Sequence, residues 1–170
     1  MFLIEKNRKY ILLGIITFII LGILMAKVLG NKQDEQFMYE DMLYAQASQM
    51  YQEGDYDGAL SISNELLKLK PRSEAVNYLG ALIAANIGEY KQASILLQKT
   101  LDINPYKVDN PVFMLQYGEV LFSAERYIDS KIVLKNIRDR GFEPQEVPGY
   151  QERVVELLNL IYSLEEEGEI

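Results

Sequence analysis

The chain has 170 residues, 49% of them hydrophobic, and it contains neither cysteine nor histidine. Without these side chains it has no disulfide, no thiolate metal site, and neither the commonest general base nor the commonest zinc ligand, so we expect no enzymatic activity, no catalytic residues, no metal site, no cofactor and no small-molecule substrate. The net charge is −8, and the 13 basic and 24 acidic residues after Gly30 give that part −11, which disfavours nucleic-acid binding because phosphates repel an acidic surface.

The first predicted element is a transmembrane helix over residues 10–30, "YILLGIITFIILGILMAKVLG", which carries no charge from residue 10 to residue 26. At about 1.5 Å per residue, about 20 residues cover the hydrocarbon layer of about 30 Å. Two alternatives remain open. A cleaved signal peptide would have a shorter apolar run and small residues at its cleavage site, and a buried core helix would keep a polar stripe.

Basic residues near this span predict its orientation in a membrane. Lys6, Arg8 and Lys9 precede the span, whereas Lys27 and Lys32 at its far end are followed closely by two acidic residues. The excess of positive charge before the span favours a cytoplasmic N-terminus over residues 1–9. The rest of the chain is then expected outside the cytoplasm, in a periplasm or at a cell surface. Residues 31–37 are expected to form a polar connector.

The next part of the sequence repeats with a period of 34 residues. Pairs of small, aromatic and proline residues recur at this one offset: Ala47 and Ala81, Gly54 and Gly88, Tyr56 and Tyr90, Ala59 and Ala93, Pro71 and Pro105. Several coincidences at one spacing indicate a repeat architecture. Glycine after a helix and proline at a helix end predict two helices in each unit.

A third, weaker unit follows the first two. Tyr127 lies 37 residues after Tyr90, so three residues have been inserted, and 107–110 is the expected place for them. Ser130 stands where the other units have alanine, and Glu125 stands where they have glycine. We expect helices over about 38–53, 56–69, 73–87, 90–103, 111–124 and 127–139. An apolar face over 151–165 predicts one more helix that caps the stack, and residues 145–170 comprise this helix and an acidic tail.

These units resemble the tetratricopeptide repeat (TPR) family, in its membrane-anchored, single-span form. The repeats span 40–73, 74–107 and 111–144, or 38–144 as a whole. The resemblance implies an all-α solenoid of about three helix pairs, with Tyr56, Tyr90 and Tyr127 as packing residues. Asn77 departs from the family pattern, which has a large apolar residue there. One interpretation is a one-residue shift of the helix over 73–87.

The resemblance also implies a concave groove lined by the first helix of each unit. The positions that face this groove in the family correspond to Tyr44, Ser48, Tyr51, Gln52, Tyr78, Leu82, Asn86, Leu115, Glu119, Phe122 and Ser123, with Asp41 at the rim. None of these residues is lysine or arginine. A groove without cations does not suit a clamp for an acidic C-terminal carboxylate. We expect the groove to take an apolar partner segment, with or without positive charge.

Two functions remain after enzymatic catalysis is set aside. The first is a membrane-anchored scaffold or accessory subunit that binds a protein partner through the groove, as part of a larger membrane-associated complex. The second is an envelope chaperone or assembly factor that assists the secretion or maturation of other proteins.

Overall fold

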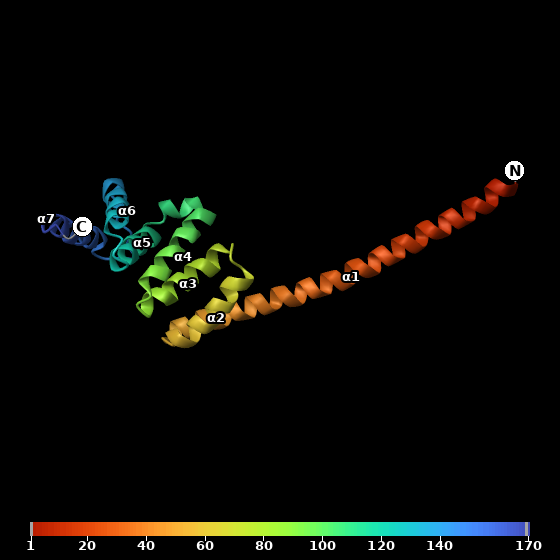
Figure 1. Cartoon of the computed structure of the whole chain (residues 1–170), viewed down its shortest axis with the longest axis horizontal. Coiled ribbons are helices and arrows are strands. Elements are labelled where there is room, and N and C mark those ends of the chain that lie inside the picture. Colours follow the sequence, from red (N-terminus) through yellow and green to blue (C-terminus); the bar gives the residue numbers. More distant parts are fainter. Residues whose placement is uncertain (1, 169) are drawn as a thin grey trace. The chain divides into compact units, whose positions relative to one another are not determined.

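The computed structural model describes residues 2–168 and 170, with side chains described from residue 9 onward. Over these residues the chain is all-helical, as predicted. It contains α1 (Phe2–Glu53), α2 (Tyr56–Leu69), α3 (Glu74–Asn86), α4 (Tyr90–Ile103), the 3₁₀ helix η1 (Pro105–Asp109), α5 (Pro111–Ser123), α6 (Tyr127–Arg140) and α7 (Tyr150–Glu166) (Figure 1). The chain divides into an N-terminal unit, Met1–Met42, and a repeat unit, Leu43–Ile170. Helix α1 contributes to both units.

The N-terminal unit exposes its apolar side chains. Every large apolar residue over 10–29 is at least 50% exposed. The stretch Lys9–Glu53 contains an 18-residue window with a mean hydropathy of 2.6, and none of this window is buried. By length and composition, this helix could cross a membrane.

The expected break after the apolar run is absent, so the prediction of separate helices over 10–30 and 38–53 is wrong. Residues 31–37 lie inside α1 and are helical. The segment contains Lys, Gln and Glu, which favour helix, and it contains no proline. Gly30 alone costs a helix only about 1 kcal/mol, which is too little to end it.

Small side chains set the distance between the two helices of each pair. Ala47 and Ala59 have no exposed surface where α1 packs against α2, and Ala81 and Ala93 are equally buried where α3 packs against α4. In the third pair Gly118 takes this place, and a Cβ there would lie 2.8 Å from Leu134 Cδ2.

The Ser130 hydroxyl donates a 2.8 Å hydrogen bond to the carbonyl of Gly118 in the facing helix. Serine therefore replaces the alanine of the other units without leaving a buried hydroxyl unsatisfied.

The corner between the two helices is the same in all three pairs. Gly54, Gly88 and Glu125 have φ angles of 81°, 83° and 62°, in the left-handed region. At each corner this residue's N–H donates to the carbonyl three residues earlier at 3.0–3.2 Å, and the next N–H donates to the carbonyl five residues earlier at 2.9 Å. The shared geometry places Glu125 in the role of the two glycines.

Polar side chains start the helices around the insertion. Asn104 accepts a hydrogen bond from the N–H of Tyr106 at the start of η1, and Asn110 accepts one from the N–H of Phe113 at the start of α5. Pro111 occupies the first turn of α5, where its missing N–H leaves no bond unmade. The three additional residues therefore form part of a 3₁₀ turn between the second and third helix pairs.

Helix α3 keeps the register of the other units, so the suggested one-residue shift is wrong. Asn77 is fully buried, as Leu43 and Met114 nearly are at the corresponding positions of their units. Its side-chain Nδ2 donates to the carbonyls of Pro71 and Ser73 at 3.1 and 2.7 Å. These bonds satisfy the NH₂ group of the amide at an apolar position, whereas its Oδ1 has no hydrogen-bond partner among the described residues.

Helix α7 packs on α5 and α6 at the end of the stack. Val154, Leu157, Leu158 and Ile161 are at most 2% exposed on its inner face. The hydroxyl of the buried Tyr150 donates a 2.8 Å hydrogen bond to the carbonyl of Pro111 at the start of α5. Burial raises the pKa of Tyr150 to about 12, so the docked helix holds this phenol neutral.

The shared corner geometry predicts opposite effects of two substitutions. We expect Glu125→Gly to raise the free energy of unfolding by about 0.5–1 kcal/mol, because glycine removes left-handed strain. Gly88→Ala should lower it by about 1 kcal/mol, although a Cβ there meets no atom within 4 Å. Urea unfolding of the full chain in detergent, followed by circular dichroism, measures both. Glu125→Ala is the control, because it removes the carboxylate but keeps a Cβ at the left-handed position. An equal increase in the free energy of unfolding for Glu125→Ala would show that the effect comes from the charge and not from the backbone.

Tyr150 predicts a loss of stability at high pH. In the unfolded chain the phenol titrates near 10, whereas in the folded chain its pKa is raised to about 12. Above pH 10 the unfolded chain loses this proton first, so the free energy of unfolding should fall as the pH rises from about 10 to 12. Tyr150→Phe should lower stability at neutral pH by about 1 kcal/mol and flatten this slope. An unchanged slope in the variant would contradict the role of Tyr150.

Candidate functional site

A hollow of about 340 Å³ lies on the repeat unit between α1, α3, α4, α5 and α7. Four residues predicted from the sequence line it: Tyr51, Leu82, Asn86 and Glu119. Ser123, also named from the sequence, lines it as well. Among the further lining residues are Ala85, Tyr90, Gln116 and Arg153. We call this hollow the groove. Its walls come from the first helices of three successive pairs together with α4 and α7.

The other predicted groove residues lie outside this hollow. Leu115 is only 6% exposed and packs in the core between α5 and its neighbours, so its prediction as a surface residue is wrong. Phe122 is half-buried, and its ring packs edge-on against Tyr127 at 5.3 Å. Tyr44 and Gln52 are exposed and Ser48 is half-buried, but none of the three lines the groove.

Tyr78 is half-buried at the edge of the groove and connects two repeats. Its hydroxyl donates a 2.6 Å hydrogen bond to Oε1 of Gln116, which lines the groove from α5. Burial is the main cause that raises the pKa of Tyr78, so the phenol stays a neutral donor. The bond fixes the amide of Gln116 and leaves its NH₂ group free of this contact.

Asn86 makes the corresponding connection between the first and second pairs. Its Nδ2 donates to the carbonyl of Leu82 at 2.8 Å and to the hydroxyl of Tyr51 at 3.4 Å. The groove is therefore lined by amides and a phenol held in place by neighbouring repeats. Such groups bind a polypeptide backbone through hydrogen bonds without requiring a particular side chain.

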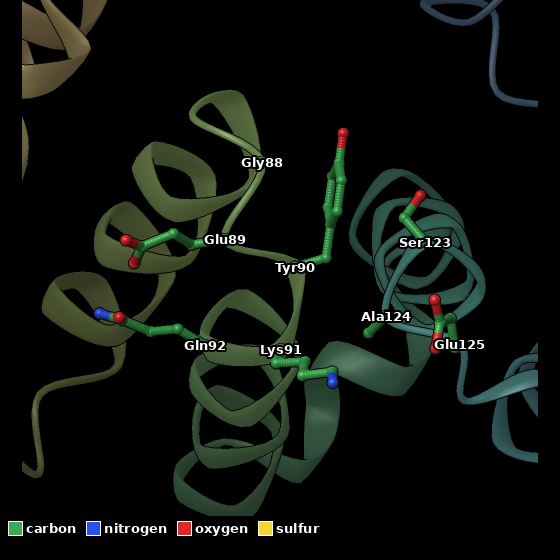
Figure 2. A pocket seen from close by; sticks show the side chains of 8 residues that line it. All are labelled: Gly88, Glu89, Tyr90, Lys91, Gln92, Ser123, Ala124 and Glu125. Atoms are coloured by element: carbon green, nitrogen blue, oxygen red, sulfur yellow. The ribbon is translucent and has the colours of Figure 1, made fainter.

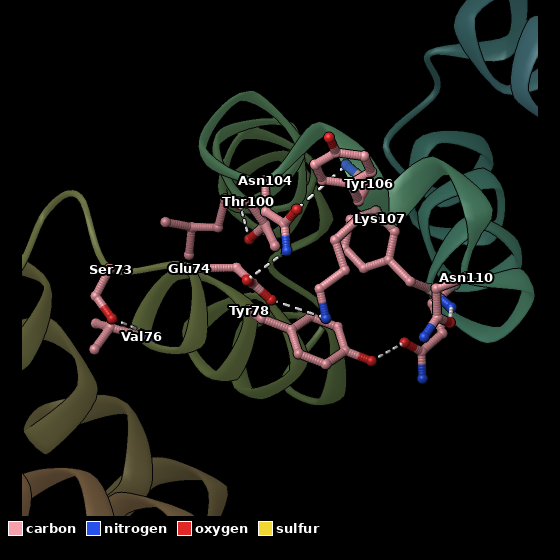
Figure 3. A network of polar contacts seen from close by, with 12 residues as sticks. Ser73, Glu74, Val76, Tyr78, Thr100, Asn104, Tyr106, Lys107 and Asn110 are labelled. Carbon is pink, nitrogen blue, oxygen red and sulfur yellow. Dashed lines mark hydrogen bonds and ion pairs between the residues drawn. The ribbon is translucent and has the colours of Figure 1, made fainter.

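A polar network beside the groove positions Tyr78 (Figure 3). Glu74 forms an ion pair with Lys107 at 2.8 Å and accepts a hydrogen bond from Asn104 at 2.8 Å. The Lys107 ammonium lies 5.2 Å from the centroid of the Tyr78 ring and 5.8 Å from that of Phe113. Hydrogen bonds from Lys107 and then Asn104 lower the pKa of Glu74, which keeps it charged. The insertion at 107–110 thus begins with a residue that links α3 to the next pair.

The groove contains one cation that was missed in the sequence. Arg153 of α7 lines it, which corrects the expectation of a groove without lysine or arginine. Its Nε lies 2.7 Å from Oε1 of Glu119, and its Nη1 lies 2.8 Å from Oε2 of Glu156. The hydrogen bond to Glu119 is the main cause that raises the pKa of Arg153. Because two carboxylates surround this single positive charge, Arg153 does not make the groove cationic.

The 34-residue period did not reveal Arg153. Helix α7 begins at Tyr150, 39 residues after α5 begins at Pro111, so it stands outside the register of the repeat. Arg153 reaches the groove because α7 packs on α5 and α6, where Lys131 of α6 also pairs with Glu165 of α7 at 2.6 Å.

Within the part of the chain that the structure describes, no group of three His, Cys, Asp or Glu side chains is placed to hold a metal ion. Glu119, the carboxylate of the groove, is paired with Arg153. The predicted lack of a cofactor and of enzymatic activity stays a prediction.

Comparison with known proteins gives the fold. No protein-family model and no curated protein sequence matches the chain. Among solved structures, it is similar to the type III secretion chaperone SycD of Yersinia enterocolitica in complex with a peptide of the translocator YopD. The TM-score is 0.59 at 18% identity, over 74% of this chain and 93% of that one.

Two further solved structures come from other organisms. The TPR2B domain of yeast Sti1, in complex with pHsp70, has a TM-score of 0.57 at 14% identity, over 74% of this chain and 98% of that one. The TPR domain of Sgt2 from Aspergillus fumigatus has a TM-score of 0.54 at 15% identity, over 76% and 81%. At these identities the similarity shows the fold alone, and the repeat unit has a TPR-like fold.

Proposed function

We propose that the groove binds a segment of a partner protein, and that the chain is a membrane-anchored scaffold or accessory subunit of a larger membrane-associated complex. The groove itself carries the first part of this proposal. It joins side chains of three successive helix pairs into one hollow whose polar groups are amides, a phenol and a compensated ion pair. A surface of this kind suits a polypeptide rather than a metal, a phosphate or a nucleic acid.

The exposed apolar face of α1 supports the second part. Large apolar side chains over 10–29 are exposed all around the helix, and water does not favour such a surface on a soluble protein. In a bilayer the same residues would contact lipid at no cost. We place residues 1–9 in the cytoplasm and the repeat unit outside it, in a periplasm or at a cell surface, because basic residues are more concentrated before the span.

The solved structures of similar fold are consistent with a groove for a protein segment. SycD was solved with a peptide of YopD, and the Sti1 domain was solved with pHsp70. The SycD match also favours the second candidate function, an envelope chaperone or assembly factor, because SycD is a secretion chaperone. A fixed subunit and a chaperone differ in whether the groove holds one partner or many.

We further propose that the groove is not catalytic. Its only acidic side chain, Glu119, is held by an arginine, and Asn86 and Gln116 do not titrate. Binding is the chemistry that remains for these groups.

The orientation in the membrane can be tested with single cysteines, because the chain contains none of its own. We expect Asn64→Cys, at an exposed position of α2, to react with a membrane-impermeant maleimide in intact cells or spheroplasts. Asn7→Cys should react only after the membrane is permeabilised. The reverse pattern would place the repeat unit in the cytoplasm, and labelling of a soluble fraction would contradict the anchor.

Occupation of the groove can be tested by photo-crosslinking in native membranes. A photoreactive amino acid at Leu82 or Asn86 should form crosslinks to a partner, because both positions line the groove. Ile95 is 55% exposed on α4 and does not line the groove, so it is the matched control. One partner at fixed stoichiometry would identify a scaffold, and many clients would identify a chaperone. Crosslinks at Ile95 alone, or at no position, would contradict a binding role for the groove.

A further inference from the structure

The three corners of the repeat unit differ in one aromatic residue. In the first pair the ring of Tyr51 packs against Tyr56 with centroids 5.7 Å apart, and in the third pair Phe122 packs against Tyr127 at 5.3 Å. Each of these pairs joins the end of the first helix to the start of the second. The residue of the second unit that corresponds to Tyr51 and Phe122 by the 34-residue period and the insertion is Ala85.

Tyr90 consequently lacks the ring that covers the other two tyrosines. Among the described residues it makes no aromatic contact of the kind seen at Tyr56 and Tyr127. The residue is 37% exposed. Ala85 and Tyr90 both line the groove.

Space is open on both sides of Tyr90. A second hollow of about 370 Å³ is lined by Tyr90 together with Gly88, Glu89, Lys91, Ser123 and Glu125. Figure 2 shows the Tyr90 ring standing between the α3–α4 turn and the C-terminal end of α5, where Ser123 lies. Two of the residues that line the groove with Tyr90, Ala85 and Ser123, have small side chains.

We propose that the space above Ala85 and beside Tyr90 is a socket for one aromatic side chain of a partner segment. This inference rests on the proposed function of the groove and names the anchor that the groove selects. The chain itself shows what fits, because an aromatic ring fills the equivalent space at Tyr51 and at Phe122. A ring supplied by a partner would complete the pair that the second unit lacks, and aromatic pairs are favoured beyond the area that they bury.

Charge around the socket specifies the neighbours of this aromatic residue. The exposed carboxylates of Glu89 and Glu125 and the ammonium of Lys91 line the second hollow, which leaves one negative charge in excess. The chain after Gly30 carries a net charge of −11. An acidic surface favours a segment whose aromatic residue is flanked by lysine or arginine, and it disfavours acidic segments. The occupant is therefore an extended segment with an aromatic anchor and basic flanks.

The test begins with peptides selected from a random library on the full-length protein in detergent. We expect the selected peptides to contain an aromatic residue next to lysine or arginine. Replacement of that aromatic residue by alanine in a synthetic peptide should weaken binding about tenfold or more, as for an anchor in a pocket. Selected peptides without an aromatic residue would overturn the inference.

Ala85→Phe tests the socket from the side of the protein. The new ring would pair with Tyr90 as Phe122 pairs with Tyr127, so we expect the variant to fold with an equal or higher melting temperature and to lose affinity for the selected peptide about tenfold or more. Ala45→Phe, at an exposed position of α1 outside the groove, is the matched control and should keep the wild-type affinity. A lower melting temperature for Ala85→Phe would show that no space is open there and would overturn the inference.

Tyr90→Ala is a second variant, which removes the one aromatic ring that the second unit has at its corner. This variant should bind the selected aromatic peptide more weakly and should bind the alanine-substituted peptide with unchanged affinity. Some peptides could crosslink to Leu82 and yet bind Ala85→Phe and the parent protein with equal affinity. Such peptides would overturn the inference of a socket but would not contradict the proposed function of the groove. A failure of any peptide to crosslink to the groove would count against both. If the parent protein self-associates and Ala85→Phe does not, as measured by light scattering, the occupant of the socket is a second copy of the chain, and the proposed partner segment would be overturned.

Discussion

The repeat unit depends on the contact between small residues inside each helix pair. Ala47 meets Ala59 and Ala81 meets Ala93 with no exposed surface, and Gly118 meets Ser130 through a hydrogen bond. Larger side chains there would push the helices apart, because protein interiors are packed without spare volume. With this distance set, each pair turns through the same left-handed corner, and the first helices of successive pairs line up along one surface.

This regularity separates residues that build the stack from residues that give it a binding surface. The corner tyrosines and the small residues repeat, whereas the residue before each corner varies from Tyr51 to Ala85 to Phe122. Variation at this position changes both the ring contact at the corner and the surface that the groove presents. The alanine of the second unit costs the stack one ring contact, and in the proposed arrangement it leaves room at Tyr90 for an aromatic side chain of a partner.

Local patterns predicted the helices well. The expected helices over 56–69 and 90–103 have the bounds observed for α2 and α4, and the other predicted ends within 56–166 lie within one residue. Prolines and glycines mark these ends through backbone geometry, which a sequence reveals directly. The continuity of α1 was not predicted, because residues 31–37 have the polar composition of a connector, although Lys, Gln and Glu also favour helix.

The groove was harder to predict, because it depends on helix rotation and on elements distant in sequence. Of the positions carried over from the family pattern, Tyr51, Leu82, Asn86 and Glu119 line the hollow, whereas Leu115 packs inward.

In the proposed arrangement, attachment of the chain to the membrane also determines how high an affinity the groove needs for its partner. The groove offers about 340 Å³, a few amides and one open ring position, which by itself suits a modest affinity. A partner in the same membrane would meet the groove at a local concentration of about millimolar when the connection is short. Weak contacts are then sufficient for occupancy, and they can be released without unfolding either protein. In this proposal, a membrane-spanning α1 would supply proximity to the partner, and the socket at Tyr90 would supply selectivity.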